Sequence, residues 1–507
     1  MDSSPPGLTV FNQTMLQKNN MQNLALSWGN LIPNIKKILS AIEQKTIIGF
    51  GMVPYPRIVP ALFLKNYVMY AVKDTADLDA LRQYKELRIF CLEEKFPKAA
   101  AKIHAASYLL GNYAFHAFLK SRRNPFRLLL HRTTAPIVQK LQDLQVDWIG
   151  NKPETFQDVW LKADFHALLK KLNISCLASI RIPKGEFSEK TFSQASQQYK
   201  PPFTVQRVYA ETGLEQNPFF IKNEDDWEDM RLALSLDQNF TEVQLSPLVQ
   251  GLSLAMVGCI THQGVLTSSL QLQFIDVPEV LQGRPPLGIL LGYDFGFCGW
   301  GSAIEIAAQK ITEQVGEFLS ARGFLGVFGI NFLYNQKTNE IFAQECIPQF
   351  PEDMHIYSLA VMDRAQVPPM DFFHIMACLG IKERFDFEAV NSKLKERLPL
   401  SHIFLLQEGI EEMKLRLNSG AYSFNAGQKT LTFQGPSAFP WELKTESEFL
   451  MLDSMPRFGG KVIGNVPSLF KLIFPRSIAE SSSAVKPDTG ALISMLSTAL
   501  RKKENLP

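Results

Sequence analysis

Two apolar runs joined by a polar turn constrain the fold of this chain more than any other feature. Residues 323–332 and 341–349 have the composition of buried strands, and residues 335–339 between them are polar and favour a turn. The pattern therefore predicts a β-hairpin. Asn331 on the first strand and Glu345 on the second each offer an oxygen atom, so both side chains are candidate metal ligands.

The composition argues against several classes of protein. The chain has 507 residues, which suggests about three domains, and hydrophobic residues make up 46% of it, enough for substantial cores. A formal net charge of +2 argues against a nucleic-acid-binding protein, which usually carries a marked basic excess. Because no run of about 18 uncharged apolar residues occurs, we expect no membrane span.

The cysteines and the N-terminal segment favour a cytoplasmic protein. The six cysteines lie far apart and form no CxxC pair, which is typical of buried free thiols in a reducing compartment. Residues 1–23 are polar and lack the basic-then-apolar order of a signal peptide. We therefore expect neither a membrane nor a nucleic acid as partner, and a homo-oligomer is left open.

Short strand-like and helix-like segments define the first half of the chain. Residues 1–30 are rich in Asn, Gln and Ser, and we expect a flexible N-terminal extension there. In residues 31–150, β-like runs alternate with helical segments, which predicts a parallel, doubly wound sheet. The strands expected in this domain are residues 46–51, 67–72, 87–92, 128–130 and 146–150.

Two further units follow along the chain. Residues 151–380 mix helical and strand-like segments, and a long amphipathic helix over residues 302–322 precedes the predicted hairpin. Residues 381–507 make a third domain. In it, residues 385–416 have a largely helical pattern, and residues 421–441 and 450–463 favour short strands with Gly/Pro turns. An amphipathic helix is expected over residues 488–503.

Taken in this order, the three domains resemble the ATP-grasp superfamily, enzymes that use ATP to activate a carboxylate. The likeness is closest to the carbamoyl-phosphate-synthase and biotin-carboxylase-like branch of carboxylate–amine ligases, and it covers roughly residues 47–379. It implies an α/β and α+β fold: an N-terminal parallel α/β domain, called the pre-ATP-grasp domain, then a two-lobed ATP-grasp domain and a small C-terminal α+β domain. It also implies ATP and Mg²⁺ as cofactors.

The resemblance assigns candidate nucleotide-binding residues. Lys162, at the start of a helix, matches the first lysine that contacts ATP in the family, and Gln206 occupies the position of the second. Gly213 lies in the loop that would close over the phosphates, although the same loop also reads as an ordinary solvated hairpin loop. The carbonyl of Pro247 and the N–H of Leu248 stand where the family's hinge strand reads adenine.

The metal-binding hairpin departs from the family pattern. Members carry an acid on the first strand and Glu-x-Asn-x-Arg on the second, whereas this chain has Asn331, Glu345, Ile347 and Gln349 there. Only Glu345 keeps a carboxylate. A glutamine cannot stabilise an acyl phosphate as a guanidinium can, and an isoleucine offers no ligand atom.

Two functions are compatible with this pattern. The resemblance implies an ATP-dependent ligase that activates a carboxylate as an acyl phosphate for attack by an amine or a thiol, with small-molecule substrates that the sequence does not identify. The alternative is a catalytically impaired homologue that acts as a nucleotide-binding scaffold or regulator. Glu352 and Asp353, just beyond the hairpin, are candidates to replace the missing charge in the first case. An unrelated α/β enzyme, such as a nucleotide-sugar transferase, is the third possibility.

Overall fold

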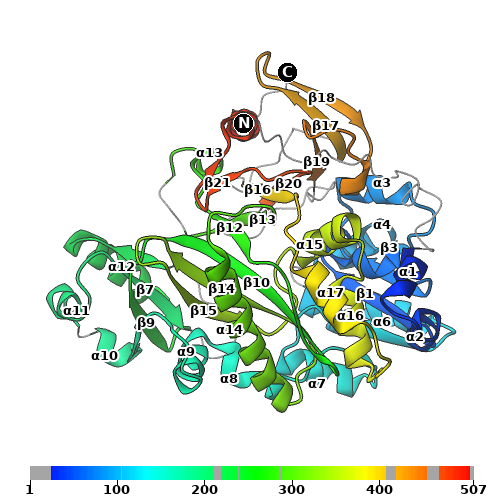
Figure 1. Cartoon of the computed structure of the whole chain (residues 1–507), viewed down its shortest axis with the longest axis horizontal. Helices are drawn as coiled ribbons and strands as arrows, with labels where there is room; N and C mark the ends of the chain where they lie inside the picture. Colours follow the sequence, from blue (N-terminus) through cyan, green and yellow to red (C-terminus); the bar gives the residue numbers. More distant parts are fainter. Residues whose placement is uncertain are drawn as a thin grey trace, which may run out of the picture.

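The structure is a computed structural model of the whole chain. It describes residues 24–103, 106–188, 190–208, 218–237, 239–284, 288–406, 418–453 and 468–502. In Figure 1 the N-terminal domain lies at the right, a small lobe at the left, and a large sheet between them leads up to the C-terminal strands. Within the described residues, no helix has both the length and the apolar character needed to cross a membrane. All six cysteines are free thiols.

The N-terminal domain is built on a parallel sheet. Its elements are β1 (Thr46–Gly51), β2 (Tyr67–Ala71), β3 (Ile89–Cys91), β4 (Phe126–Leu129), β5 (Trp148–Ile149), α2 (Ile35–Ile42), α3 (Ala76–Arg82), α4 (Leu92–Lys95), α5 (Pro97–Ala100), α6 (Tyr113–Lys120) and α7 (Ala135–Asp143). The strands run parallel in the order β3-β2-β1-β4-β5. Ile48 and Tyr70 pack into one core, and Ile47 and Met69 pack into another. Both faces are therefore covered, which confirms the predicted parallel α/β domain.

The segment just before this domain is packed against the rest of the protein. The described part of the predicted extension forms α1 (Leu24–Ser27) and a 3₁₀ turn, η2 (Trp28–Asn30). The Trp28 side chain is 1% exposed and makes edge-to-face contacts with Phe63 and Phe372. Residues 24–30 therefore belong to a hydrophobic core, although their polar neighbours in the sequence suggested a loose tail.

The small lobe is a four-stranded antiparallel sheet with helices on one face. Two helices lead into the lobe, α8 (Gln157–Trp160) and α9 (Lys162–Lys171). The lobe itself contains β6 (Ile180–Pro183), β7 (Phe203–Val208), β8 (Phe219–Ile221), β9 (Glu242–Pro247), α10 (Lys184–Ser188), α11 (Phe192–Gln198) and α12 (Glu224–Ser235). The strand order is β6-β9-β7-β8. A core around Trp227 joins the helices to the sheet face that carries Val205 and Leu245.

The large sheet begins in the second half of residues 151–380. Its strands there are β10 (Leu252–Thr261), β11 (Gly264–Thr267), β12 (Gln271–Ile275), β13 (Leu290–Asp294), β14 (Gly326–Asn335) and β15 (Glu340–Ile347). The helices are α13 (Pro278–Leu281), α14 (Ser302–Ala321), α15 (Met354–Ala360), a π turn η7 (Val361–Ala365) and α16 (Met370–Cys378). β14 and β15 pair antiparallel, as the sequence predicted for this hairpin. Helix α14 packs on β10 and β11.

The C-terminal strands extend the same sheet. They are β16 (Ser401–Leu406), β17 (Gly420–Asn425), β18 (Thr430–Gly435), β19 (Glu448–Asp453) and β20 (Ser468–Phe474), accompanied by α17 (Phe387–Leu394), a β21–β22 hairpin (Ala479–Ser481 and Ala484–Val485) and α18 (Pro487–Lys502). The full order is β15-β14-β10-β12-β13-β16-β20-β19-β17-β18, with β11 paired to β10. The domain boundaries at residues 150 and 380 stay a prediction.

The predicted helix over residues 385–416 is wrong in its middle part. α17 ends at Leu394, and Ser401–Leu406 forms β16, which pairs with β13 on one side and β20 on the other. A short, mostly apolar run of six residues does not distinguish strand from helix by periodicity alone. Partners far away in the sequence decide its structure. Residues 407–416 lie outside the described residues.

Candidate functional site

The two predicted metal ligands bind each other. Asn331 on β14 and Glu345 on β15 are direct partners across the hairpin, next to a register shift. The Asn331 side-chain amide donates to Glu345 Oε2 at 3.0 Å, and Gln273 on β12 donates through Nε2 to Asn331 Oδ1 at 3.1 Å. Ser253 Oγ in turn donates to Gln273 Oε1 at 2.8 Å. The neutral amide of Asn331 is thus engaged at both its nitrogen and its oxygen.

The other two hairpin positions supply no charge. Ile347 on β15 lines a cavity beside Asn331 with an apolar side chain. Gln349 lies just beyond β15, and its buried Oε1 has no hydrogen-bond partner among the residues that the structure describes. Among the described residues, no group of three His, Cys, Asp or Glu side chains is placed to hold a metal ion. A cation here would depend on Glu345 and on oxygens from a ligand.

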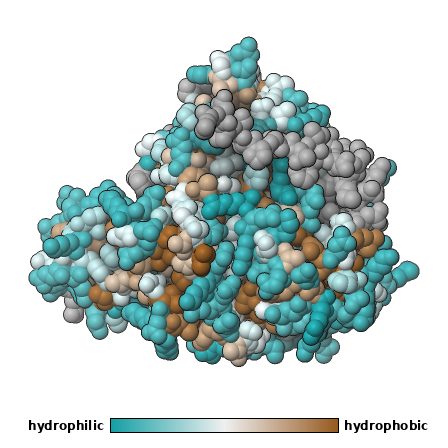
Figure 2. Space-filling model, viewed as in Figure 1, coloured by the Kyte–Doolittle hydropathy of each residue, from teal (hydrophilic) through white to brown (hydrophobic). Residues whose placement is uncertain are grey.

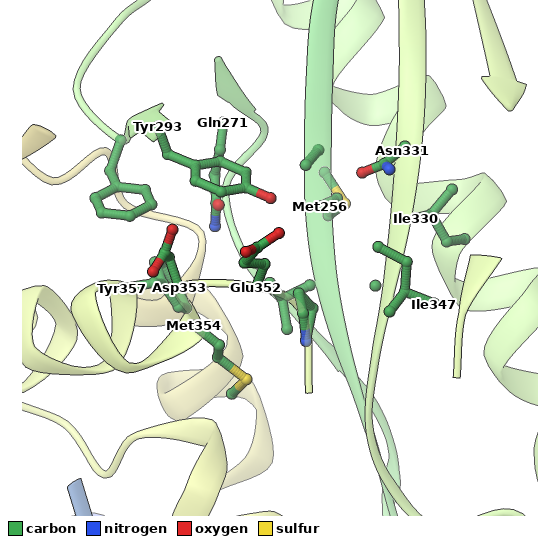
Figure 3. A pocket seen from close by; sticks show the side chains of 15 residues that line it. Met256, Gln271, Tyr293, Ile330, Asn331, Ile347, Glu352, Asp353, Met354 and Tyr357 are labelled. Atoms are coloured by element: carbon green, nitrogen blue, oxygen red, sulfur yellow. The ribbon is translucent and has the colours of Figure 1, made fainter. Parts of the chain in front are cut away.

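A small cavity adjoins this hairpin. Its volume is about 10 Å³, room for roughly one water molecule, and Asn331, Tyr293, Glu352 and Asp353 are among the residues that line it. Figure 3 shows the Glu352 carboxylate beside the Tyr293 ring, with the strand that carries Met256 between it and the strand that carries Asn331. The structure therefore brings Glu352 and Asp353 to the neighbourhood of the hairpin, as the sequence could only suggest.

Burial changes the protonation of the acidic pair. The pKa of Glu352 rises to about 7 because the protein partly desolvates its carboxyl group and because the Asp353 carboxylate lies nearby, although the residue keeps an exposed surface. For Asp353, burial alone would raise the pKa, but Lys471 and His402 outweigh it and hold the pKa below its ordinary value. Asp353 is therefore an anion at neutral pH, while Glu352 titrates near neutral pH.

Asp353 belongs to a buried charged cluster that the sequence did not reveal. Lys471 Nζ on β20 donates to Asp353 Oδ1 at 2.7 Å and lies 3.0 Å from His355 Nε2. His402 Nε2 on β16 lies 3.3 Å from Asp353 Oδ2. Burial lowers the pKa of both histidines, so both are neutral at pH 7. The only signal in the sequence is a lysine inside the apolar run Ser468–Phe474.

The structure brings together two predicted phosphate-binding residues. Lys162 is the first residue of α9, and its ammonium donates to Gln206 Oε1 on β7 at 3.0 Å. The contact joins the start of the helix to the sheet of the small lobe. Gly213, the predicted loop residue, lies outside the described residues. The nucleotide-binding role of all three stays a prediction.

The predicted hinge lies at the end of β9. Pro247 ends the strand and pairs with Phe203, and the Leu248 N–H donates to the Pro202 carbonyl at 3.3 Å. This hydrogen bond is longer than the usual N–H···O distance and is therefore weak, so an acceptor atom of a ligand could replace the Pro202 carbonyl. The assignment of Pro247 and Leu248 as adenine-reading groups stays a prediction.

Comparison with protein-family models and with curated proteins finds no match, whereas comparison with solved structures finds the same fold. Among solved structures, the chain is similar to the biotin carboxylase domain of 2-oxoglutarate carboxylase from Hydrogenobacter thermophilus in complex with MgADP, ADP and bicarbonate. The TM-score is 0.54 at 10% identity, over 85% of this chain and 86% of that one.

Two other structures extend the comparison. A biotin carboxylase from Campylobacter jejuni, solved as a beta-gamma-ATP complex, gives a TM-score of 0.53 at 12% identity, over 86% of this chain and 88% of that one. An N5-carboxyaminoimidazole ribonucleotide synthetase in complex with ADP gives 0.50 at 10% identity, over 90% and 98%. The chain therefore has the ATP-grasp fold, arranged as in the biotin-carboxylase-like structures.

Proposed function

We propose that this chain binds an adenine nucleotide between its small lobe and its large sheet but transfers phosphate poorly or not at all. The observation that supports this most is the hydrogen-bonded row of Gln273, Asn331 and Glu345. It places a neutral amide against the Glu345 carboxylate. The fold supports nucleotide binding by analogy with proteins of similar structure. The residues of the hairpin support weak or absent phosphoryl transfer.

The donor set fits a pair of magnesium ions poorly. Mg²⁺ prefers oxygen ligands in a near-octahedral arrangement, usually carboxylates together with nucleotide phosphates. Here Asn331 Oδ1 already accepts from Gln273, and Glu345 Oε2 already accepts from Asn331. Both oxygens therefore have less capacity left for a metal ion, and Glu345 is the carboxylate at these positions that could hold one. Phosphoryl transfer depends on neutralising the charge of the transferred group, so this chain supports that step weakly.

Nucleotide binding needs less from the hairpin. The Lys162 ammonium at the entrance of the small lobe offers a positive charge to phosphates, and Gln206 beside it offers amide hydrogen bonds. The backbone of Pro247 and Leu248 would read adenine. These contacts do not require the missing carboxylates, and we therefore expect binding to be largely independent of Mg²⁺.

An ATP-dependent carboxylate–amine or carboxylate–thiol ligase is the second candidate, and one observation favours it. Glu352 lines the same cavity as Asn331, and its pKa of about 7 suits a group that donates or accepts a proton near neutral pH. In a ligase, Glu352 would take the proton of an amine or thiol as it attacks an acyl phosphate.

One experiment separates the candidates. The melting temperature is measured with ATP, with ATP and Mg²⁺, and with nucleotide-sugars, because a ligand that prefers the folded state raises it. ADP release is then followed across a panel of carboxylates and amines. We expect ATP alone to raise the melting temperature, Mg²⁺ to add little, and ADP not to appear. Substrate-dependent ADP release would establish the ligase, and a response to nucleotide-sugars without one to ATP would refute both candidates.

A further inference from the structure

One buried glutamine of the small lobe has a side chain without hydrogen-bond partners among the described residues. Gln244, in the middle of β9, is 1% exposed. Neither its Oε1 nor its Nε2 has a hydrogen-bond partner among the described residues. Buried side-chain amides are almost always hydrogen-bonded, so an exception of this kind calls for a physical reason.

The position of Gln244 places it among the candidate nucleotide-binding residues. Gln244 is the direct cross-strand partner of Gln206 on β7 and of Arg181 on β6. Directly paired residues in a sheet point to the same face, so Gln244 and Gln206 lie side by side. The residues on either side of Gln244, Val243 and Leu245, belong to the hydrophobic core on the other face.

Two polar side chains near the start of helix α9 reach the face that carries Gln244. Lys162 at the start of the helix donates to Gln206, and Asp164 pairs with Arg181 at 3.2 Å. Both neighbours of Gln244 in the sheet therefore have polar partners on α9, whereas Gln244 between them has none in the described structure. In the described structure, the Gln244 amide thus lies between two hydrogen-bonded neighbours and has no partner of its own.

The energetics favour a ligand role over a structural one. Each buried polar group without a partner costs about 1–3 kcal/mol, and leucine, which is close to glutamine in size, would avoid that cost. A side chain that destabilises the unliganded protein in this way is expected at functional sites. The cost disappears if a bound molecule supplies one donor and one acceptor.

We propose that Gln244 determines base specificity by binding the adenine ring of the nucleotide. A glutamine amide can pair with adenine through two hydrogen bonds, accepting from N6–H and donating to N7. Such a pair satisfies both unused atoms of Gln244 at once. The inference rests on the proposed nucleotide binding, and it assigns to the side chain of Gln244 a role separate from that of the hinge backbone.

The test compares ATP with 7-deaza-ATP, in which a C–H group replaces N7, on the wild-type protein and on Gln244→Leu. Affinity is measured by calorimetry and stability by thermal unfolding. We expect the wild-type protein to bind 7-deaza-ATP several-fold more weakly than ATP. Gln244→Leu should raise the melting temperature of the unliganded protein, bind ATP roughly tenfold more weakly and no longer distinguish the two nucleotides. Gln197→Leu, on helix α11 of the same lobe, is the matched control and should keep both affinities.

Each result decides the proposal. Equal binding of ATP and 7-deaza-ATP by the wild-type protein would overturn it, and so would wild-type ATP affinity in Gln244→Leu. If Gln244→Leu does not fold, Gln244→Met provides the same comparison, and the wild-type measurement stands by itself. Absence of ATP binding to the wild-type protein would instead refute the proposed function, which keeps the two failures distinct.

Discussion

At the scale of single residues, Asn331 is the most important departure from the family pattern, which has an acid at this position. The hairpin pattern was enough to predict that Asn331 and Glu345 occupy the candidate metal positions. It could not predict that the Asn331 amide donates to Glu345, because that contact depends on the register of β14 and β15 and on the irregularity beside Asn331. Gln273, which completes the row, comes from a third strand and carries no signal of its own in the sequence.

Restoring the missing acid should restore a response to magnesium. In Asn331→Asp a carboxylate faces Glu345, and the repulsion between like charges should lower the stability of the metal-free protein by about 1–3 kcal/mol. Mg²⁺ with ATP should remove this loss, so the melting temperature should become strongly dependent on Mg²⁺. Gln336→Glu, in the exposed turn of the same hairpin, is the control and should show no such dependence. An unchanged response to Mg²⁺ in Asn331→Asp would contradict the account of this site.

Glu352 should make stability depend on pH. Its folded-state pKa of about 7 lies above the ordinary value of 4.5, so the folded protein holds a proton that the unfolded chain has already released. The contribution of this group to stability therefore decreases as pH rises from about 4.5 to about 7, and stays low above that. Because solvent screens the exposed part of Glu352, Glu352→Gln should be only modestly more stable than the wild type at pH 8, and the difference should disappear near pH 4.5. Urea unfolding at both values checks this, and a difference that does not vary with pH would refute it.

At the scale of elements, the sequence predicted the strands of the N-terminal sheet and the β14–β15 hairpin because their apolar patterns are local. It missed β16 and β20, which become strands through their pairing with each other and with β13 and β19. β20 also contains a buried lysine, Lys471. A lysine in an apolar run argues against a buried strand, unless the fold supplies a carboxylate such as Asp353.

The pair formed by Lys471 and Asp353 should hold β20 against the start of α15. Lys471→Met leaves the Asp353 carboxylate buried without its counter-ion, and we expect a loss of about 3–5 kcal/mol in the free energy of unfolding. The double variant with Asp353→Asn should recover part of that loss, because no charge then remains to be neutralised. Lys444→Met, at an exposed position before β19, should change stability by less than about 0.5 kcal/mol. An additive double variant would show that the two side chains act independently.

At the scale of the whole molecule, the resemblance predicted the arrangement of domains over residues 47–379, and the structural comparisons support the same fold over 85% of the chain. The sequence did not predict that the C-terminal strands continue the large sheet (Figure 1). Their pairing joins segments more than one hundred residues apart, such as β13 and β16, so no local pattern records it. Figure 2 shows a largely hydrophilic surface with apolar residues gathered in the lower half of this face.

The central claim is that a nucleotide occupies the space between the small lobe and the large sheet and that the hairpin lacks the charge for phosphoryl transfer. A crystal structure of the protein grown with ATP, in the presence and absence of Mg²⁺, tests it most directly. The account predicts intact ATP with its phosphates near Lys162 and Gln206 and the Asn331–Glu345 hydrogen bond preserved in both crystals. ATP bound elsewhere, or two magnesium ions held between Glu345 and the phosphates, would contradict it.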